Sequence, residues 1–320
     1  MTIDGTISVP GNRTVTNDNR ARLMVWGTLG VMLAAALAFV WRYGSNVPSW
    51  DDWDMVPTMT GHQPVTLEWL WSQHNEHRVP VPRIIGLALY WLFGNNFRVG
   101  MYFNVITVGS LAFAMILLTK RLRGHLEYSD AFFPLLLLNW AQGVNFIWSW
   151  QIEFFSSTAL AASVLLIIVY RGVRPTLRSA ILMGICLFLV AMCGAHGVAL
   201  LPALALWIGY FGVRCWRSPG RSARRDGTII VGIAGLVLLF VGLYFVGYQR
   251  LPYHPRSLGF RAPLKTAVQF LTMGLGPAVR SVWPFSGFAA LVLLLLSVVL
   301  LAKRFWKMPV LLFILSLLKK

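Results

Sequence analysis

The chain has 320 residues, of which 57% are hydrophobic and only 12% are charged, and its formal net charge is +17. Soluble domains carry about 25% charged residues, so this composition excludes an ordinary soluble domain and predicts an all-α polytopic membrane protein. The basic residues lie in short clusters between apolar runs, which is the positive-inside pattern and not a nucleic-acid-binding surface. The cysteines Cys186, Cys193 and Cys215 lack metal or disulfide spacing and are expected to pack in the apolar runs.

Several apolar runs approach the roughly 20 residues that a helix needs to cross a bilayer. They cover 23–41, 98–119, 131–148, 150–170, 179–195, 197–213, 228–247 and 285–302, and a shorter run follows at 308–318. We therefore expect about 8–9 transmembrane helices in one domain over 23–318, after a disordered cytoplasmic tail over 1–22. Because the last run is about half a span, the sequence indicates either an unusual natural end or a chain that is truncated at its C-terminus.

Basic clusters predict the orientation of these spans. They lie at Arg13–Arg22, Lys120–Arg123, Arg171–Arg178, Arg214–Arg225 and Lys303–Lys307, and two spans separate each consecutive pair. If all clusters face the cytoplasm, the N-terminus is cytoplasmic. Loops 42–97, 142–153, 194–197 and 248–284 then lie on the outer face. This division places every histidine except His125 outside, which predicts an external site at the membrane surface.

The segment Val79–Phe93 is apolar but is expected not to span. It contains Pro80, Pro82 and Arg83, and counting it as a span would invert every later helix. We expect it to lie in the outer interface, where its Tyr and Trp side chains are favoured. The segment Pro263–Arg280 is expected to be a second interfacial helix.

An acidic group follows the first apolar run. Asp51, Asp52 and Asp54 lie within four residues and are flanked by Trp50 and Trp53. Mutual repulsion raises carboxylate pKa values, so one of the three, Asp51 or Asp52 in particular, is a candidate general base. The alternative is a solvated loop or a helix start capped by aspartate.

A second group follows in the same loop, at His74, Asn75, Glu76, His77 and Arg78. On a helical turn the two histidines would share a face. Arg78 and Arg83 offer guanidinium forks to a phosphate, and the imidazoles add donors. The alternatives are a structural polar cluster or a divalent cation held by Asp52, His74 and His77.

Two outer turns add further candidates. Gln151 and Glu153 lie among Trp148 and Trp150 and predict a sugar-binding surface, because aromatic rings stack on pyranose rings while amides and acids bind hydroxyl groups. Trp53 is a further candidate for a sugar or membrane contact. An interfacial aromatic belt is the alternative. His196 occupies the turn Cys193–Gly197 and is either a ligand or an ordinary turn residue. His254 and Arg256 are weaker candidates.

The order of these motifs resembles the GT-C class of membrane glycosyltransferases, including the aminoarabinose, mannosyl and PMT-like families. In that class an acidic pair follows the first span, then a K-P-P-L-x-Y-W…F-G segment, then a span closing on R-R-L-x-G. The matching stretches here are Asp51-Asp52, Arg78-Val-Pro-Val-Pro-Arg83 through Tyr90-Trp91 and Phe93-Gly94, and Lys120-Arg-Leu-Arg-Gly124. The class lysine is absent, and many relatives have Asp-Glu as the pair. The resemblance covers mainly residues 23–200.

The resemblance implies transfer of a sugar from a polyprenyl-phosphate donor to an envelope lipid, glycan or protein, with inversion, on the outer face of a bacterial inner or plasma membrane. The residues fit that chemistry. A lipid phosphate is already a good leaving group, so one carboxylate base suffices, unlike the carboxylate pair of a glycosidase. Cationic donors such as Arg78 and His77 would bind the departing phosphate.

Two other readings remain. A transporter or flippase of a lipid-linked or anionic solute would line its pathway with charges and Gly/Pro-broken helices in matching halves, and the predicted spans show neither. A non-catalytic membrane scaffold has no positive feature in its favour.

Overall fold

The computed structural model describes residues 15–171, 176–252, 259–272 and 281–305. The chain divides into two compact units, residues 1–251 and residues 252–320, and each is described by itself. The first unit contains the polar loop and the candidate site. The expectations for residues 1–14, for His254 and Arg256 and for the run at 308–318 concern residues outside the described ranges.

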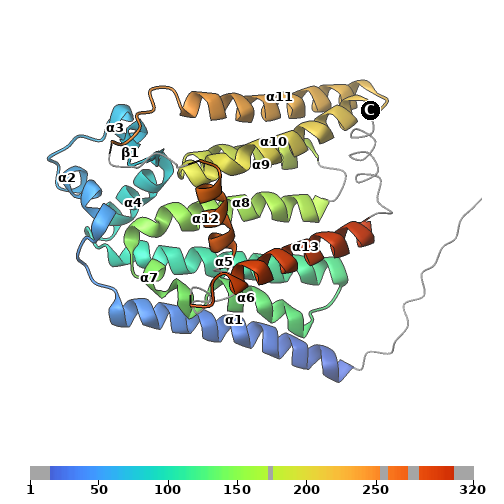
Figure 1. Ribbon diagram of the computed structural model, residues 1–320, viewed down its shortest axis with the longest axis horizontal. Coiled ribbons are helices and arrows are strands. Elements are labelled where there is room, and N and C mark those ends of the chain that lie inside the picture. Colours follow the sequence, from blue (N-terminus) through green and yellow to red (C-terminus); the bar gives the residue numbers. More distant parts are fainter. Residues whose placement is uncertain (1–14, 172–175, 253–258, 273–280, 306–320) are drawn as a thin grey trace, which may run out of the picture. The chain divides into compact units, whose positions relative to one another are not determined.

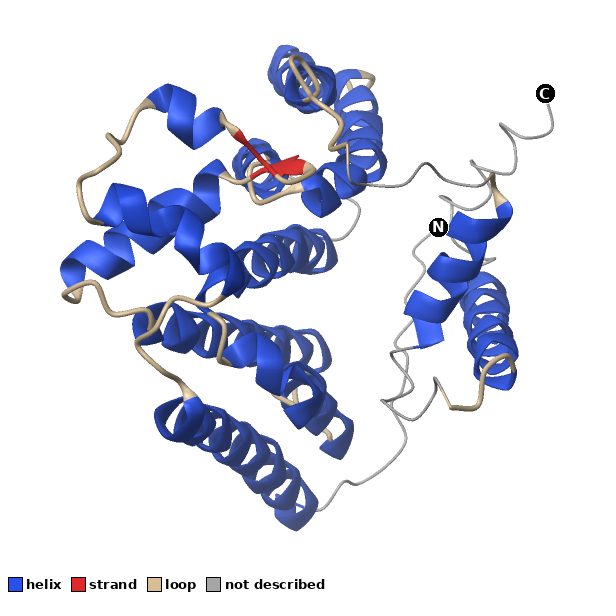
Figure 2. Ribbon diagram, turned by 60° about the vertical axis from the view of Figure 1, so that its left-hand side comes forward, coloured by secondary structure: helices blue, strands red, loops and turns tan. Residues whose placement is uncertain are grey.

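Short elements at the start of the first unit connect two long helices. In chain order the elements are α1 (Val15–Tyr43), η1 (Trp50–Met55), α2 (Val56–Met59), α3 (Leu67–Trp71), β1 (Gln73–His74), β2 (His77–Arg78), α4 (Pro80–Leu92) and α5 (Arg98–Arg123). The two strands form a small antiparallel sheet (Figure 2).

In the later part of the first unit, the elements that the structure describes are helices. Its elements are η2 (Tyr128–Ala131), α6 (Phe132–Leu137), η3 (Trp140–Gln142), α7 (Gly143–Phe146), η4 (Ser149–Gln151), α8 (Ile152–Arg171), α9 (Leu177–Ala191), α10 (Ala195–Trp216) and α11 (Arg221–Tyr244). The second unit contributes α12 (Arg261–Thr272) and α13 (Phe285–Phe305).

Among the described residues, five helices are long and apolar enough to cross a bilayer, which indicates an integral membrane protein. They cover Asp18–Tyr43, Arg98–Arg123, Ser149–Arg171, Ala195–Trp216 and Arg221–Tyr244. Shorter apolar helices lie at Pro80–Leu92, Leu177–Ala191 and Phe285–Leu300. The all-α class is therefore confirmed, whereas the number of 8–9 spans is not.

The expected continuous span at 131–148 is wrong, because short helices interrupt this stretch. Helix α6 ends at Leu137, and the side chain of Asn139 accepts a hydrogen bond from the amide of Ala141 at 2.9 Å to begin a new turn. A side chain that bonds its own backbone competes with a continuing helix. The stretch still extends from one end of the helices to the other. Near its start Asp130 pairs with Arg123 of α5, and at its end Trp148 Nε1 donates to the carbonyl of Ser49, with a distance of 3.1 Å.

The ends of two other expected segments also differ from the structure. Helix α1 begins at Val15, so residues 15–22 are helical and not part of a disordered tail. Asp18 lies in its first turn, where a negative charge is favourable. The expected interfacial helix at 263–280 is described as α12 over Arg261–Thr272, and the rest of it lies outside the described residues. Helix α4 agrees with the expected short helix over 79–93.

The long helices of the first unit lie side by side and form a bundle with two ends (Figure 1). At one end Arg98 Nη2 donates to the carbonyl of Trp41 at 2.8 Å, joining α5 to α1. At the other end the guanidinium of Arg121 lies 4.6 Å from the ring of Tyr170, joining α5 to α8. We call the end that holds residues 44–97 the polar end. The basic residues of 120–123 and 214–225, together with Arg171 and Arg178, belong to the opposite end, as the charge pattern predicts.

Helices α10 and α11 pack most tightly near the opposite end. A Cβ atom at Gly227 would lie 2.4 Å from the backbone nitrogen of Trp216 and 2.7 Å from the carbonyl oxygen of Gly212. Backbone atoms cannot rotate away as a side chain can, so this contact requires glycine. Gly232, further along α11, has nothing within 4 Å of its Cβ position.

We expect Gly227→Ala to lower the free energy of unfolding by about 1–3 kcal/mol through overpacking. The matched control is Gly232→Ala on the same helix, which should leave stability unchanged or raise it, since alanine favours helix more than glycine. Thermal unfolding in detergent compares the two. Equal midpoints for both variants would contradict the close packing of α10 and α11.

Candidate functional site

A two-stranded hairpin carries the two histidines of the polar loop. His74 pairs directly with His77 across the strands, and their ring centroids lie 5.7 Å apart. The turn between them begins at Asn75, whose φ of 47° lies in the left-handed region that asparagine tolerates. The two imidazoles therefore meet because of strand pairing and not because of a helical turn.

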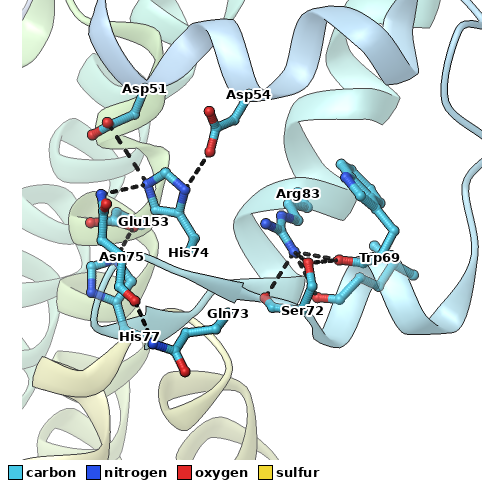
Figure 3. Close-up of polar contacts among 11 residues, drawn as sticks. Asp51, Asp54, Trp69, Ser72, Gln73, His74, Asn75, His77, Arg83 and Glu153 are labelled. Atoms are coloured by element: carbon cyan, nitrogen blue, oxygen red, sulfur yellow. Dashed lines mark hydrogen bonds and ion pairs between the residues drawn. The ribbon is translucent and has the colours of Figure 1, made fainter. Parts of the chain in front are cut away.

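Arg83 fastens the short helix α3 to α4. Its Nη1 donates to the carbonyls of Trp69, Leu70 and Ser72 and to the Ser72 hydroxyl (Figure 3). The guanidinium also lies 4.8 Å from the ring of Trp69. These carbonyls lie at the C-terminal end of α3, where few intrahelical donors remain, and the buried cation adds donors to them. The carbonyl of Trp69 also accepts from the Ser72 amide at 3.2 Å.

Arg78 fastens the hairpin to the end of α11. Its guanidinium donates to the carbonyls of Trp71 at 2.6 Å, Val246 at 2.9 Å and Tyr244 at 3.2 Å. Its own amide donates to the Tyr244 hydroxyl at 2.7 Å. The side chain is buried, so these groups have little water to replace the bonds. The expected contact of Arg78 with a phosphate stays a prediction, and in this structure backbone carbonyls occupy its donors.

Gln73 makes a second connection between the hairpin and the segment that follows α11. Its amide nitrogen donates to the carbonyl of Gln249 at 2.6 Å, and its carbonyl oxygen accepts from the Gln249 amide at 3.0 Å. Together with Arg78, this pair fixes the hairpin against residues 244–249, although more than 160 residues separate the two segments in the chain.

Asp52 is buried within the polar loop. Its Oδ2 accepts from the amide of Ser49 at 3.1 Å, at the start of η1, and its exposed fraction is 0%. Burial raises the pKa of Asp52 to about 7, although the Ser49 hydrogen bond acts in the opposite direction. Asp52 therefore acts as the cap that one of the sequence alternatives describes, with no open path to a substrate.

Asp51 and Asp54 lie on either side of the His74 ring (Figure 3). Asp54 Oδ2 lies 2.6 Å from His74 Nδ1, and Asp51 Oδ1 lies 3.8 Å from His74 Nε2. The histidine side chain is 5% exposed, whereas the carboxylates are 36% and 53% exposed. Burial raises the pKa of Asp51, with Asp54 and Glu153 adding to the shift and His74 opposing it. The hydrogen bond with His74 lowers the pKa of Asp54.

Glu153 joins the first turn of α8 to the hairpin. Its Oε2 lies 3.4 Å from Nε2 of His77, and its side chain is only 3% exposed. Burial acts to lower the pKa of His77, but the carboxylates of Glu153, Glu76 and Asp51 outweigh it, so the net shift is upward. Glu153 is thus the buried acid that favours a charged His77.

His196 lies beside this pair at the start of α10. Its Nε2 is 2.6 Å from the hydroxyl of Ser157, and its ring stacks on Phe154 at 4.7 Å. A Cβ atom at Gly194 would lie 2.9 Å from His196 Cε1 and 3.9 Å from His77 Cδ2. The turn at Gly194 therefore brings His196 to the same cluster.

The remaining predicted residues lie around this cluster. Asn75 Nδ2 lies 3.2 Å from His74 Nε2, Gln151 is buried in η4, and Trp148 bonds Ser49. Trp53 is 57% exposed at the surface of η1. Nothing tests whether these side chains contact a substrate, so their binding roles stay predictions.

A metal site is not supported by the positions of these side chains. Within the described ranges, no group of three or more His, Cys, Asp or Glu side chains lies close enough together to hold a metal ion. The predicted cation ligands Asp52, His74 and His77 do not converge, since Asp52 faces the amide of Ser49 and His74 faces Asp54.

Sequence reasoning missed Ser157, and it named Trp150 only as one of the aromatic rings beside Gln151 and Glu153. Trp150 packs its ring 4.6 Å from that of His74, and Ser157 bonds His196. A signal existed for Ser157, which lies four residues after Glu153 and so on the same face of α8. Trp150 had none beyond its position in an aromatic turn.

Comparison with protein-family models, curated proteins and solved structures gives no match for this chain. Functional inference therefore rests on the geometry of the polar end.

We expect Arg78→Met to lower the free energy of unfolding by about 3 kcal/mol, because one buried and two partly buried carbonyls would lose a charged donor. The control is Arg42→Met, an exposed arginine on α1, which should change stability by no more than about 0.5 kcal/mol. Thermal unfolding in detergent measures both, and limited proteolysis should show faster cleavage of loop 44–97 only in Arg78→Met. An unchanged cleavage rate would contradict the fastening role.

We expect the stability contributed by His77 to depend on pH. Its folded pKa is raised above the ordinary 6.5, so the contribution is complete below pH 6.5 and is lost as the pH rises through the folded value. His77→Gln should therefore be destabilised most at acidic pH, and its difference from the wild type should narrow on going to alkaline pH. Unfolding midpoints measured from acidic to alkaline pH test whether the stability difference narrows as the pH rises. The control is His62→Gln, in which the replaced histidine is exposed. A constant difference would argue against the pairing with Glu153.

Proposed function

We propose that this protein is a membrane glycosyltransferase that uses a polyprenyl-phosphate sugar, and that Asp51 is its general base. The observation that carries the proposal is the half-exposed Asp51 carboxylate, which faces His74 at the polar end of the membrane helices. A base must be accessible to an acceptor hydroxyl group and have a pKa closer to the working pH than a free aspartate has. Asp51 meets both conditions.

The choice between the two neighbouring acids rests on their surroundings. Asp52 has 0% exposure and caps η1 through the Ser49 amide, so no substrate can reach it without unfolding the turn. Asp51 lies between exposed tryptophans, Trp50 at 82% and Trp53 at 57% exposure. Aromatic rings beside a carboxylate suit a sugar acceptor or the headgroup level of a membrane.

The donor phosphate would be bound mainly by His77. The raised pKa of His77 favours its charged form, and a cation stabilises the negative charge that develops on the departing lipid phosphate. Arg78 and Arg83 contribute their charge to this end of the protein, while their donors hold the loop. The acceptor oxygen attacks the anomeric carbon, Asp51 takes its proton, and the phosphate leaves with inversion.

The transporter reading receives no support from the described spans. Their charged side chains lie near the helix ends, at Asp18–Arg22 and Arg42 of α1, at Arg98 and Lys120–Arg123 of α5, at Glu153 and Arg171 of α8, at Arg214 of α10 and at Arg221–Asp226 of α11. A pathway for an anionic solute requires polar groups at the depth of the membrane centre.

We expect Asp51→Asn to lower the transfer rate by about 10²–10⁴, the usual contribution of a general base, while the protein stays folded. Asp52→Asn should keep most of the rate, because asparagine can still accept the Ser49 hydrogen bond and carries no buried charge. The purified protein in nanodiscs is supplied with polyprenyl-phosphate hexoses and pentoses and with extracted envelope acceptors, and mass spectrometry measures the glycosylated product. Full activity of Asp51→Asn would refute the assignment of the base.

A further inference from the structure

The polar end contains a histidine that the transfer step itself does not need. His74 is almost fully buried, yet both of its ring nitrogens face polar groups of the loop. Nδ1 lies 2.6 Å from Asp54, and Nε2 lies 3.2 Å from the Asn75 amide nitrogen and 3.8 Å from Asp51 (Figure 3). A structural histidine needs one partner to satisfy its N–H group, and this ring has a carboxylate on each side.

The partners determine the tautomer of His74. A carboxylate only accepts, so the 2.6 Å contact with Asp54 places a proton on Nδ1. The Asn75 amide nitrogen only donates, so its contact leaves the lone pair on Nε2. The basic nitrogen of His74 is therefore the one that faces Asp51, and Trp150 packs against the ring at 4.6 Å.

We propose that Asp54 and His74 form a relay that removes the proton from Asp51 after each transfer, so that Asp51 is again a carboxylate for the next acceptor. This proposal rests on the proposed function. Asp51 receives the acceptor proton during the transfer and passes it to Nε2 of His74. The resulting imidazolium is stabilised by the charge of Asp54. Nε2 then gives the proton to water at the exposed side of the loop, which restores the Nδ1–H tautomer. No other bond changes, and the proton is conserved at each step.

The geometry gives each member a separate task. Asp51 is half-exposed and reaches the acceptor, His74 is enclosed and cannot, and Asp54 is the most exposed of the three. His74 and Asp54 are positioning residues in this scheme, because they act on the substrate only through Asp51. The same arrangement of acid, imidazole and reacting group occurs wherever a carboxylate orients a histidine and stabilises its cation.

The charged groups around His74 determine the expected effect of pH. Asp51 and Asp54 on η1, Glu76 and His77 on the hairpin, Glu153 on α8 and Arg83 on α4 all act on this cluster. Asp51 works as a base when it is deprotonated, so the rate falls as the pH drops through its pKa. His74 opposes the raised pKa of Asp51 when its ring carries the relayed proton, and Asp54 adds to the raised pKa. Loss of the histidine should therefore move the acidic limb of the pH profile to higher pH, and loss of Asp54 should not.

The test compares His74→Gln, Asp54→Asn and the control His62→Gln, in which the replaced histidine is exposed in the same loop. We expect kcat to fall at least tenfold in the first two variants with little change in KM. The acidic limb should shift upward only in His74→Gln. Asp54→Glu should recover part of the rate, and added imidazole should raise the rate of His74→Ala but not of His62→Ala.

The possible results distinguish failure of the relay from failure of the proposed glycosyltransferase function. A wild type that transfers sugar, together with an unshifted pH profile and full kcat in His74→Gln, would overturn the relay alone. An equal loss of rate without any limb shift or imidazole rescue would show a purely structural histidine and also overturn it. A folded wild type that transfers no sugar from any polyprenyl-phosphate donor would overturn the proposed function and the relay with it.

Discussion

The hydrogen bonds from two buried guanidinium groups to backbone carbonyls hold the polar end together. Helix ends leave carbonyl oxygens without intrahelical donors, and such groups are costly to bury. Arg83 satisfies those of α3 and Arg78 those that follow α11. An arginine can do this because its planar fork offers several donors with one charge. The positions of His74 and His77, and hence of the whole cluster, depend on this fastening.

Much of the fold follows from the distribution of charge. The basic clusters and the polar loop separate to opposite ends of the helices because charged groups are expensive at the depth of a bilayer. The same reasoning correctly makes Pro80–Leu92 a short helix in the loop and not another span. The charge and hydropathy pattern did not predict the interrupted helix at 131–148, because the hydropathy of this stretch resembles that of a span. There a local side-chain bond at Asn139 competes with the helix, and hydropathy does not record such bonds.

The site was predicted less completely than the fold. The proximity of His74 and His77 was expected from a helical turn, whereas a hairpin with a left-handed Asn75 produces it. Asp52 has a local signal, since Ser49 precedes it by three residues as in a capping box. The contact of His77 with Glu153 has no such signal, because tertiary packing alone brings residues 76 positions apart together.

The attachment of the hairpin to residues 244–249 has a consequence for how the protein is made. All acids and histidines of the cluster except Glu153 and His196 lie before residue 80, so they leave the ribosome early. The segment that holds them in place comes last in the first unit, after α11. Domains emerge from the N-terminus onward during synthesis. The hairpin therefore lacks its bonds to residues 244–249 until α5, α8, α9, α10 and α11 have been made, and the site is completed only after α11.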